Sequence, residues 1–112
     1  MEKDFDESLA SYVSELIHED LGLAIKDAEQ WLEKHPRSPG LLLSLARLNR
    51  EHKLWGKSKA YFNSSLNLKP NAAVYHEFGQ LLETLKENEA AQTCYQYGLR
   101  FSLTNKGEVL NI

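Results

Sequence analysis

Residues 42–66, LLSLARLNREHKLWGKSKAYFNSSL, are matched 33 residues later by residues 75–99, YHEFGQLLETLKENEAAQTCYQYGL. Large side chains fall on large ones and small on small: Leu42, Leu45, Ala46, Ser58, Phe62, Ser65 and Leu66 correspond to Tyr75, Phe78, Gly79, Ala91, Tyr95, Gly98 and Leu99. A period in the low thirties, with two helix-length apolar patterns per unit, is typical of stacked helix-turn-helix repeats. The sequence therefore predicts an all-α repeat protein, a class that binds other molecules more often than it catalyses reactions.

The size and charge of the chain narrow the class further. Its 112 residues are enough for one domain with a core of its own. The net charge is -3, with 13 cationic residues scattered among 16 acidic ones, whereas a nucleic-acid binder shows a clustered basic face. The single cysteine, Cys94, cannot form an internal disulfide. We expect a protein partner and no nucleic acid.

The composition of the chain argues against a membrane span and a secretory signal. No apolar run approaches the roughly 20 residues that span a bilayer. The first seven residues, 1–7, are acidic rather than basic and then apolar, which argues against a secretory signal. We expect this stretch of chain to be soluble and to make no membrane contact of its own.

Apolar spacing and helix-terminating residues predict six helices. Ser38-Pro39 and Asn71 are favourable helix starts, whereas His35-Pro36, Lys69-Pro70 and Asn105-Lys106-Gly107 are helix stops. The expected helices cover approximately residues 6–18, 21–34, 39–52, 55–68, 72–85 and 89–102.

These helices form three antiparallel hairpins in one domain, residues 1–112. The units are approximately residues 5–38, 39–71 and 72–104, followed by a tail at 105–112. Two helices approach closely only where side chains are small. We therefore interpret the small residues of the repeat as contact points between paired helices: Ala46, Ser58, Ser65, Gly79, Ala91 and Gly98.

This pattern resembles the tetratricopeptide repeat (TPR). The family places a large residue at position 4, Leu-Gly or Leu-Ala at 7 and 8, small residues at 20 and 27, an aromatic at 24 and a proline at 32. The last two units fit, except that Asn49 stands where an aromatic is usual and Leu103 where proline is usual. In the first unit the small residue Ala28 stands where the pattern has an aromatic, and the large residue Trp31 stands where it has a small one. The resemblance implies a right-handed superhelix.

A narrower resemblance covers residues 28–99. The segments EQWLEKHP at 29–36, LLLSLARL at 41–48 and LWGKSKAY at 54–61 are similar to the C-terminal region of HemY-type proteins, as are 81–87 and 95–99. That family implies a bacterial inner-membrane protein associated with late haem biosynthesis, in which membrane helices precede the repeats. The chain would then be a C-terminal fragment of a membrane-anchored parent, and its partners would include haem-biosynthesis enzymes.

In TPR hairpins the first helix of each unit lines a concave groove, and its outward residues select the partner. Here the mixed charge of these residues suits a protein or peptide that carries both signs. The alternative is that they are merely solvated helix faces. The predicted groove residues are Leu43, Ser44, Arg47, Arg50, Glu51, His76, Glu77, Gln80, Glu83 and Thr84.

Histidine and cysteine spacing predicts no metal site and no resident cofactor. The four histidines lack the i, i+3 or i, i+4 pairing that places two ligands on one helix face. The resemblance to a haem-associated family makes His76 and Cys94 candidate iron ligands. Cys94 lies among packing residues, however, and is interpreted as a buried thiol. His76 is interpreted as a surface residue. Trp31 and Trp55 are interpreted as core residues beside the turns.

Three functions remain open from sequence alone. The first is a scaffold of the HemY type, the second is a TPR adaptor unrelated to haem, and the third is a porphyrin carrier. No nucleophile with a base, phosphate loop or paired carboxylate predicts catalysis. We also expect the end face of the last hairpin to be covered by the apolar tail residues Val109, Leu110 and Ile112 or by self-association.

Overall fold

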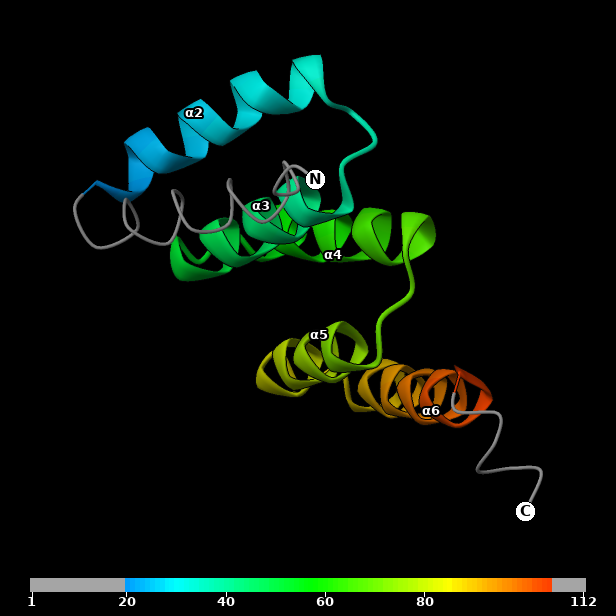
Figure 1. Cartoon of the computed structure of the whole chain (residues 1–112). Coiled ribbons are helices and arrows are strands. Elements are labelled where there is room, and N and C mark those ends of the chain that lie inside the picture. The colour runs from blue at the N-terminus through cyan, green and yellow to red at the C-terminus, as the bar shows by residue number, and fades with distance from the viewer. Residues whose placement is uncertain (1–19, 106–112) are drawn as a thin grey trace. The chain divides into compact units, whose positions relative to one another are not determined.

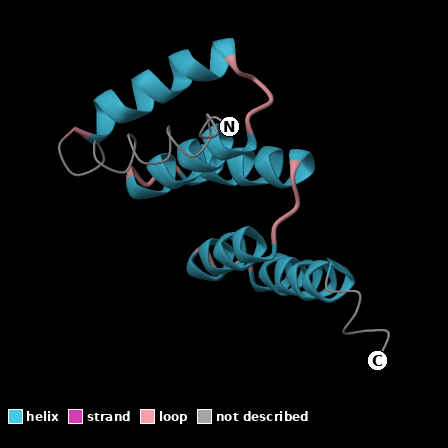
Figure 2. Cartoon of the chain, in the orientation of Figure 1, coloured by secondary structure: helices cyan, strands magenta, loops and turns pink. Residues whose placement is uncertain are grey.

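The structure is a computed structural model and describes residues 20–105 (Figure 1). Over this range the chain is helical apart from short connections (Figure 2), so the all-α prediction is confirmed. The helices are α2 (Leu21–Lys34), α3 (Pro39–Glu51), α4 (Trp55–Leu68), α5 (Ala72–Thr84) and α6 (Asn88–Asn105). The helix expected at residues 6–18 and the tail after Asn105 lie outside the described residues.

The described helices belong to two compact units that divide after Leu68. In the first unit α3 packs against both α2 and α4. In the second unit α5 packs against α6. The right-handed superhelix concerns the relation between units and stays a prediction.

The starts of α3 and α5 are built in the same way, 33 residues apart. The Leu41 amide donates to Ser38 Oγ over 3.1 Å, and the Val74 amide donates to Asn71 Oδ1 over 3.0 Å. Each cap satisfies one amide that the first helical turn leaves without an intrahelical partner. The N-caps predicted at Ser38 and Asn71 are therefore confirmed. The sequence repeat is a repeat of local structure.

The turns inside the two hairpins also correspond. The Lys53 amide donates to the Arg50 carbonyl, and the Lys86 amide donates to the Glu83 carbonyl, over 3.0 and 2.9 Å. The Leu54 amide then donates to the Asn49 carbonyl, and the Glu87 amide donates to the Leu82 carbonyl, both over 2.8 Å. These are Schellman motifs, which place the residue after the helix cap in the left-handed region. Lys53 and Lys86 accordingly have φ of 62° and 64°.

Helix boundaries differ from prediction by a few residues at some C-termini. α5 ends at Thr84, with Leu85 as its cap, and α3 ends at Glu51, with His52 as its cap. α6 continues to Asn105 rather than ending near Ser102. The helix therefore extends to the Asn-Lys-Gly stop signal, because nothing earlier in α6 interrupts its backbone hydrogen bonds.

The α3–α4 hairpin is held by two serine hydroxyls that reach across to the backbone of α3. Ser58 Oγ donates to the Ala46 carbonyl over 2.7 Å, and Ser65 Oγ donates to the Pro39 carbonyl over 2.8 Å. Phe62, between these serines in α4, is fully buried. The predicted small-residue contacts in this hairpin are confirmed. Their short side chains allow backbone and hydroxyl to meet directly.

The α5–α6 hairpin uses glycines where α3–α4 uses alanine and serine. A Cβ at Gly79 would overlap Cε1 of the Tyr95 ring. A Cβ at Gly98 would lie 3.0 Å from Tyr75 Cβ and 3.4 Å from the Ala72 carbonyl oxygen. Both glycines are buried, as is Ala91. The close approach predicted at Gly79 and Gly98 is confirmed.

The first unit also contains a cluster between α2 and α3. Ala24 and Ala28 of α2 are fully buried with Leu41, Leu45 and Leu48 of α3. Partly buried side chains surround this cluster, among them Leu21, Ile25, Trp31, Leu32 and Tyr61. Trp31 therefore packs against the core, as predicted. Apolar burial of this kind supplies most of the stabilisation of an amphipathic helix.

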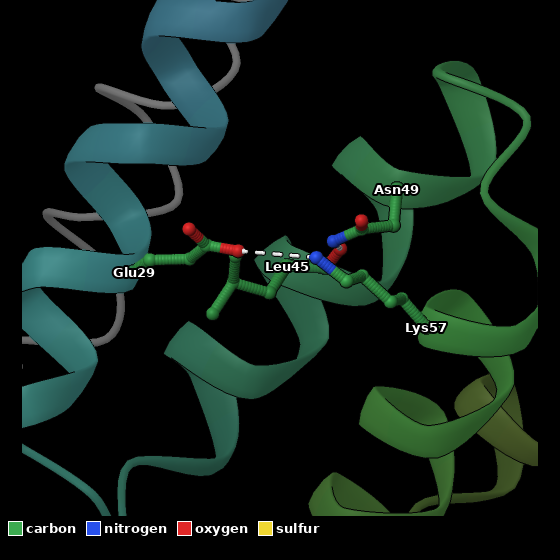
Figure 3. A network of polar contacts seen from close by, with 4 residues as sticks. All are labelled: Glu29, Leu45, Asn49 and Lys57. Carbon is green, nitrogen blue, oxygen red and sulfur yellow. Dashed lines mark hydrogen bonds and ion pairs between the residues drawn. The ribbon is translucent and has the colours of Figure 1, made fainter.

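A polar residue, Asn49, lies inside the first unit (Figure 3). It is fully buried, and its Nδ2 donates to the Leu45 carbonyl over 2.8 Å. Its Oδ1 is buried and has no hydrogen-bond partner in the structure. Figure 3 also draws Lys57 of α4, whose Nζ lies 3.9 Å from Glu29 Oε2 of α2. Asn49 thus carries an unsatisfied acceptor where the TPR pattern has an aromatic ring.

Candidate functional site

The predicted binding residues of α3 are only partly at the surface. Arg47 and Glu51 are exposed, whereas Leu43 and Arg50 are half-buried. Ser44 is 5% exposed, so the expectation that it faces outward is corrected. Its short side chain lies on the buried side of a helix that packs against two neighbours, α2 and α4. The residues that α3 offers to a partner are therefore Leu43, Arg47, Arg50 and Glu51.

Arg50 has a contact within the first unit as well as an accessible side. Its guanidinium carbon lies 5.8 Å from the centre of the Phe62 ring. A cation over an aromatic face at this distance contributes about 0.5–1 kcal/mol at a partly exposed site. Removing Arg50 would therefore lower stability as well as charge. For testing binding alone, Arg47 is the better residue because it is more exposed.

The predicted binding residues of α5 are almost all accessible. His76, Gln80, Glu83 and Thr84 are exposed, and Glu77 is half-buried. Their spacing places them along successive turns of the helix. Thr84 donates its hydroxyl to the Gln80 carbonyl over 3.0 Å, an intrahelical bond that occupies the donor. The predicted set of α5 is thus a surface set.

Tyr95 of α6 joins this surface, which sequence reasoning missed. Its hydroxyl donates to Glu83 Oε1 over 2.8 Å. Its ring centre lies 5.3 Å from that of His76, with the planes tilted by 41°. Gly79 leaves the space that the ring occupies. Tyr95 therefore connects His76 to Glu83 and fixes the orientation of the Glu83 carboxylate.

The environment of Tyr95 raises the pKa of its phenol above the ordinary value of 10.0. Desolvation of the ring is the largest cause, followed by the hydrogen bond to Glu83 and the charge of that carboxylate. Each of these disfavours the phenolate. At neutral pH the phenol is therefore protonated, and its hydroxyl donates to Glu83 Oε1.

A shallow pocket of about 360 Å³ lies next to this group in the second unit. Its walls are apolar and aromatic with one imidazole: Ala72, His76, Tyr95, Gly98 and Leu99. Leu99 is 63% exposed at its rim. A pocket of this size fits one large apolar side chain, and it lies at the low end of ligand-site volumes.

The two predicted sets belong to different units of the chain. The α3 set lies in the unit that ends at Leu68, and the α5 set lies in the other. Each is therefore described by itself. The single groove expected from the TPR resemblance stays a prediction.

The remaining candidate residues show no assembled chemistry in residues 20–105. Cys94 is buried and free, and burial raises the pKa of its thiol. No group of three or more His, Cys, Asp or Glu in this range could hold a metal ion. Of the helices described, none has the length and apolar character needed to cross a membrane. Trp55 is half-buried.

Comparison with known proteins adds no assignment, since neither a protein-family model nor a curated protein matches the chain.

Proposed function

We propose that the chain is a helical-repeat module that binds another protein through the exposed side chains of α3 and α5. The repeated geometry supports this proposal most strongly. Helix caps, hairpin turns and interhelical contacts recur 33 residues apart, and the first helix of each hairpin carries charged and polar residues at its surface. Repeats of this kind are used mainly for protein recognition.

The charges on α3 and α5 indicate which charges a partner should carry. α3 presents Arg47 and Arg50 with Glu51, whereas α5 contains two glutamates, Glu77 and Glu83, and no lysine or arginine. A partner that carries both signs therefore suits the module. Charges at such surfaces contribute more to specificity and association rate than to raw affinity.

We propose further that the module comes from a HemY-type protein and scaffolds enzymes of late haem biosynthesis beside the bacterial inner membrane. Only the likeness of segments such as residues 29–36 and 41–48 supports this step. An adaptor unrelated to haem and a porphyrin carrier are the alternatives. The 360 Å³ pocket beside His76 suits a side chain better than a porphyrin, which favours protein recognition over a carrier.

Affinity capture from bacterial lysate with exposed-residue variants tests the binding role. Arg47→Ala and Gln80→Ala remove exposed side chains from α3 and α5. Arg37→Ala and Gln30→Ala are matched controls, since both side chains are exposed and belong to neither set. We expect the first pair to reduce capture of a specific protein while the controls leave it unchanged. Equal capture by all four variants would contradict the proposed surfaces.

Titration with haem separates the carrier from the scaffold. We expect no Soret shift and no stoichiometric haem binding. A saturable Soret shift that His76→Ala abolishes would replace the scaffold with the carrier.

A further inference from the structure

The end of α6 exposes positions whose counterparts in the repeat are buried. Leu99 is 63% exposed, whereas Leu66, which stands 33 residues earlier, is 6% exposed. Tyr95 is half-buried, whereas its counterpart Phe62 is fully buried. In a repeat array each helical hairpin buries apolar surface against its neighbours. The α5–α6 hairpin therefore exposes apolar surface at Leu99, a position that is buried in the preceding hairpin.

The pocket gives this position a shape. Leu99 and Gly98 line it together with the Tyr95 and His76 rings, whose centres lie 5.3 Å apart. Because Gly98 has no side chain and Tyr95 is held by Glu83, the pocket is largely formed before a ligand arrives. A preformed pocket lowers the ordering cost of binding.

The charge beside the pocket selects the occupant. Glu83 accepts one hydrogen bond from Tyr95 through Oε1, and its side chain is exposed. Glu77 is a second carboxylate on α5, which has no lysine or arginine between Ala72 and Thr84. A cationic side chain complements this surface, and an acidic one is repelled.

We propose that the pocket beside His76, Tyr95 and Leu99 binds an amphipathic helix of a partner protein, with one apolar side chain in the pocket and a lysine or arginine at Glu83. The spacing follows from α5. His76 and Glu83 are seven residues apart, which is about 10 Å along a helix. The partner's apolar and basic residues are therefore two helical turns apart. This inference rests on the proposed function and names the chemistry of its partner.

An NMR titration of the full chain tests the proposal. The probe is an alanine-based helical peptide that carries one leucine and one lysine two turns apart. We expect saturable amide shift changes centred on His76, Glu83, Gly98 and Leu99. Leu99→Ser should weaken binding roughly tenfold, the effect of losing one anchoring contact. Glu83→Gln should weaken it about two- to fivefold, as for an exposed ion pair.

Matched controls make the result specific. Leu23→Ser removes another exposed leucine, 45% exposed in α2, and should leave binding unchanged. A peptide with glutamate in place of lysine should bind more weakly and should not respond to Glu83→Gln. Glu83→Gln keeps an oxygen that can accept the Tyr95 hydroxyl.

Three results would overturn the proposal. The first is that the amide shifts do not change, or change away from His76, Glu83, Gly98 and Leu99. The second is that the lysine and glutamate peptides bind equally well. The third is that the chain self-associates with rising concentration and that Leu99→Ser abolishes this association. The last would assign the pocket to a second copy of the chain. If the peptide fails to bind here while Arg47→Ala still reduces partner capture, this inference fails and the proposed function stands.

Discussion

The hydroxyl of Ser58 in α4 donates to the backbone carbonyl of Ala46 in α3 over 2.7 Å, with both residues fully buried. The bond requires two short side chains at one crossing, because a longer one at either position would separate the helices. In the second hairpin the same crossing has Gly79 and Ala91, which cannot make this bond. The same position of the repeat therefore has a hydrogen bond between the helices in the first hairpin and only small side chains in the second.

Replacing Ser58 with alanine should lower the free energy of unfolding by about 0.5–1.5 kcal/mol, the net contribution of a buried hydrogen bond. Chemical denaturation measures the change. Ser64→Ala, at an exposed position of the same helix, is the control and should stay within about 0.5 kcal/mol of the parent. A Ser58 variant as stable as this control would show that the hydroxyl contributes nothing.

Gly79→Ala should destabilise the chain although alanine is the better helix former. Its Cβ would meet the Tyr95 ring, with Cδ1 and Cζ only 2.8 Å away. Overpacking of this kind typically costs about 1–3 kcal/mol, against a gain in helix propensity of about 1 kcal/mol. Gly56→Ala is the matched control, because a Cβ there meets nothing within 4 Å. We expect denaturation curves to show Gly79→Ala less stable and Gly56→Ala up to about 1 kcal/mol more stable than the parent. Stabilisation by both changes would contradict the close contact.

Glycine at either hairpin turn should stabilise the protein. Lys53 and Lys86 have φ of 62° and 64°, a region in which a side chain is strained. We expect Lys53→Gly and Lys86→Gly each to raise the free energy of unfolding by about 0.5–1 kcal/mol. Lys26→Gly, at an exposed position within α2, should lower it by about 1 kcal/mol. Thermal and chemical denaturation would disprove the turn geometry if all three changes were destabilising.

Asn49→Leu should raise the free energy of unfolding by about 1 kcal/mol. The substitution removes a buried oxygen that has no partner, at similar side-chain volume, and its cost is one Nδ2 hydrogen bond to Leu45. Leu48→Asn, which introduces a polar group at a neighbouring fully buried position, should be strongly destabilising. Denaturation of both variants provides the measurement. A loss of stability in Asn49→Leu would mean that the oxygen is satisfied in solution, for example by a buried water.

Cys94 should react slowly with thiol reagents in the folded protein. Burial raises the pKa of its thiol above 9.0, so little thiolate forms at pH 8. By linkage, this group's contribution to stability is fully present below the unfolded pKa, and it is lost as the pH rises through the raised folded pKa. Ellman's reagent should react with native protein far more slowly than it reacts with free glutathione. It should react with unfolded protein at a rate similar to that of glutathione. Equal rates for native protein and glutathione would contradict the burial.

Much of the local structure was predictable because it depends on short-range rules. Ser38, Asn71 and the residues before Pro36 and Pro70 set helix limits through cap hydrogen bonds and the restricted backbone next to proline. Periodic apolar side chains predicted helical segments that the structure contains at residues 21–34 and 55–68. The period of 33 residues predicted small residues at the contacts between paired helices, and the structure has such contacts at Ser58, Gly79 and Gly98.

The candidate site depended on contacts between helices, which periodicity does not specify. Ser44 was expected at the surface as one of the outward residues of the first helix of its unit, yet packing of α3 against two neighbours buries it. The repeat matches Tyr95 to Phe62, and the predicted binding set leaves Tyr95 out. The one available signal was its hydroxyl, since a tyrosine at an aromatic packing position needs a polar partner.

The sequence by itself determined the repeat, most of the helix limits and the small-residue positions, because each follows from the backbone preferences of a few neighbouring residues or from a regular spacing. Only the tertiary structure placed Arg50 over Phe62 and Tyr95 against Glu83 and His76, and left Leu99 exposed where Leu66 is buried. These relations join residues from different helices. They depend on how closely the helix backbones approach, which Gly79 and Ser58 allow but no single segment of sequence encodes.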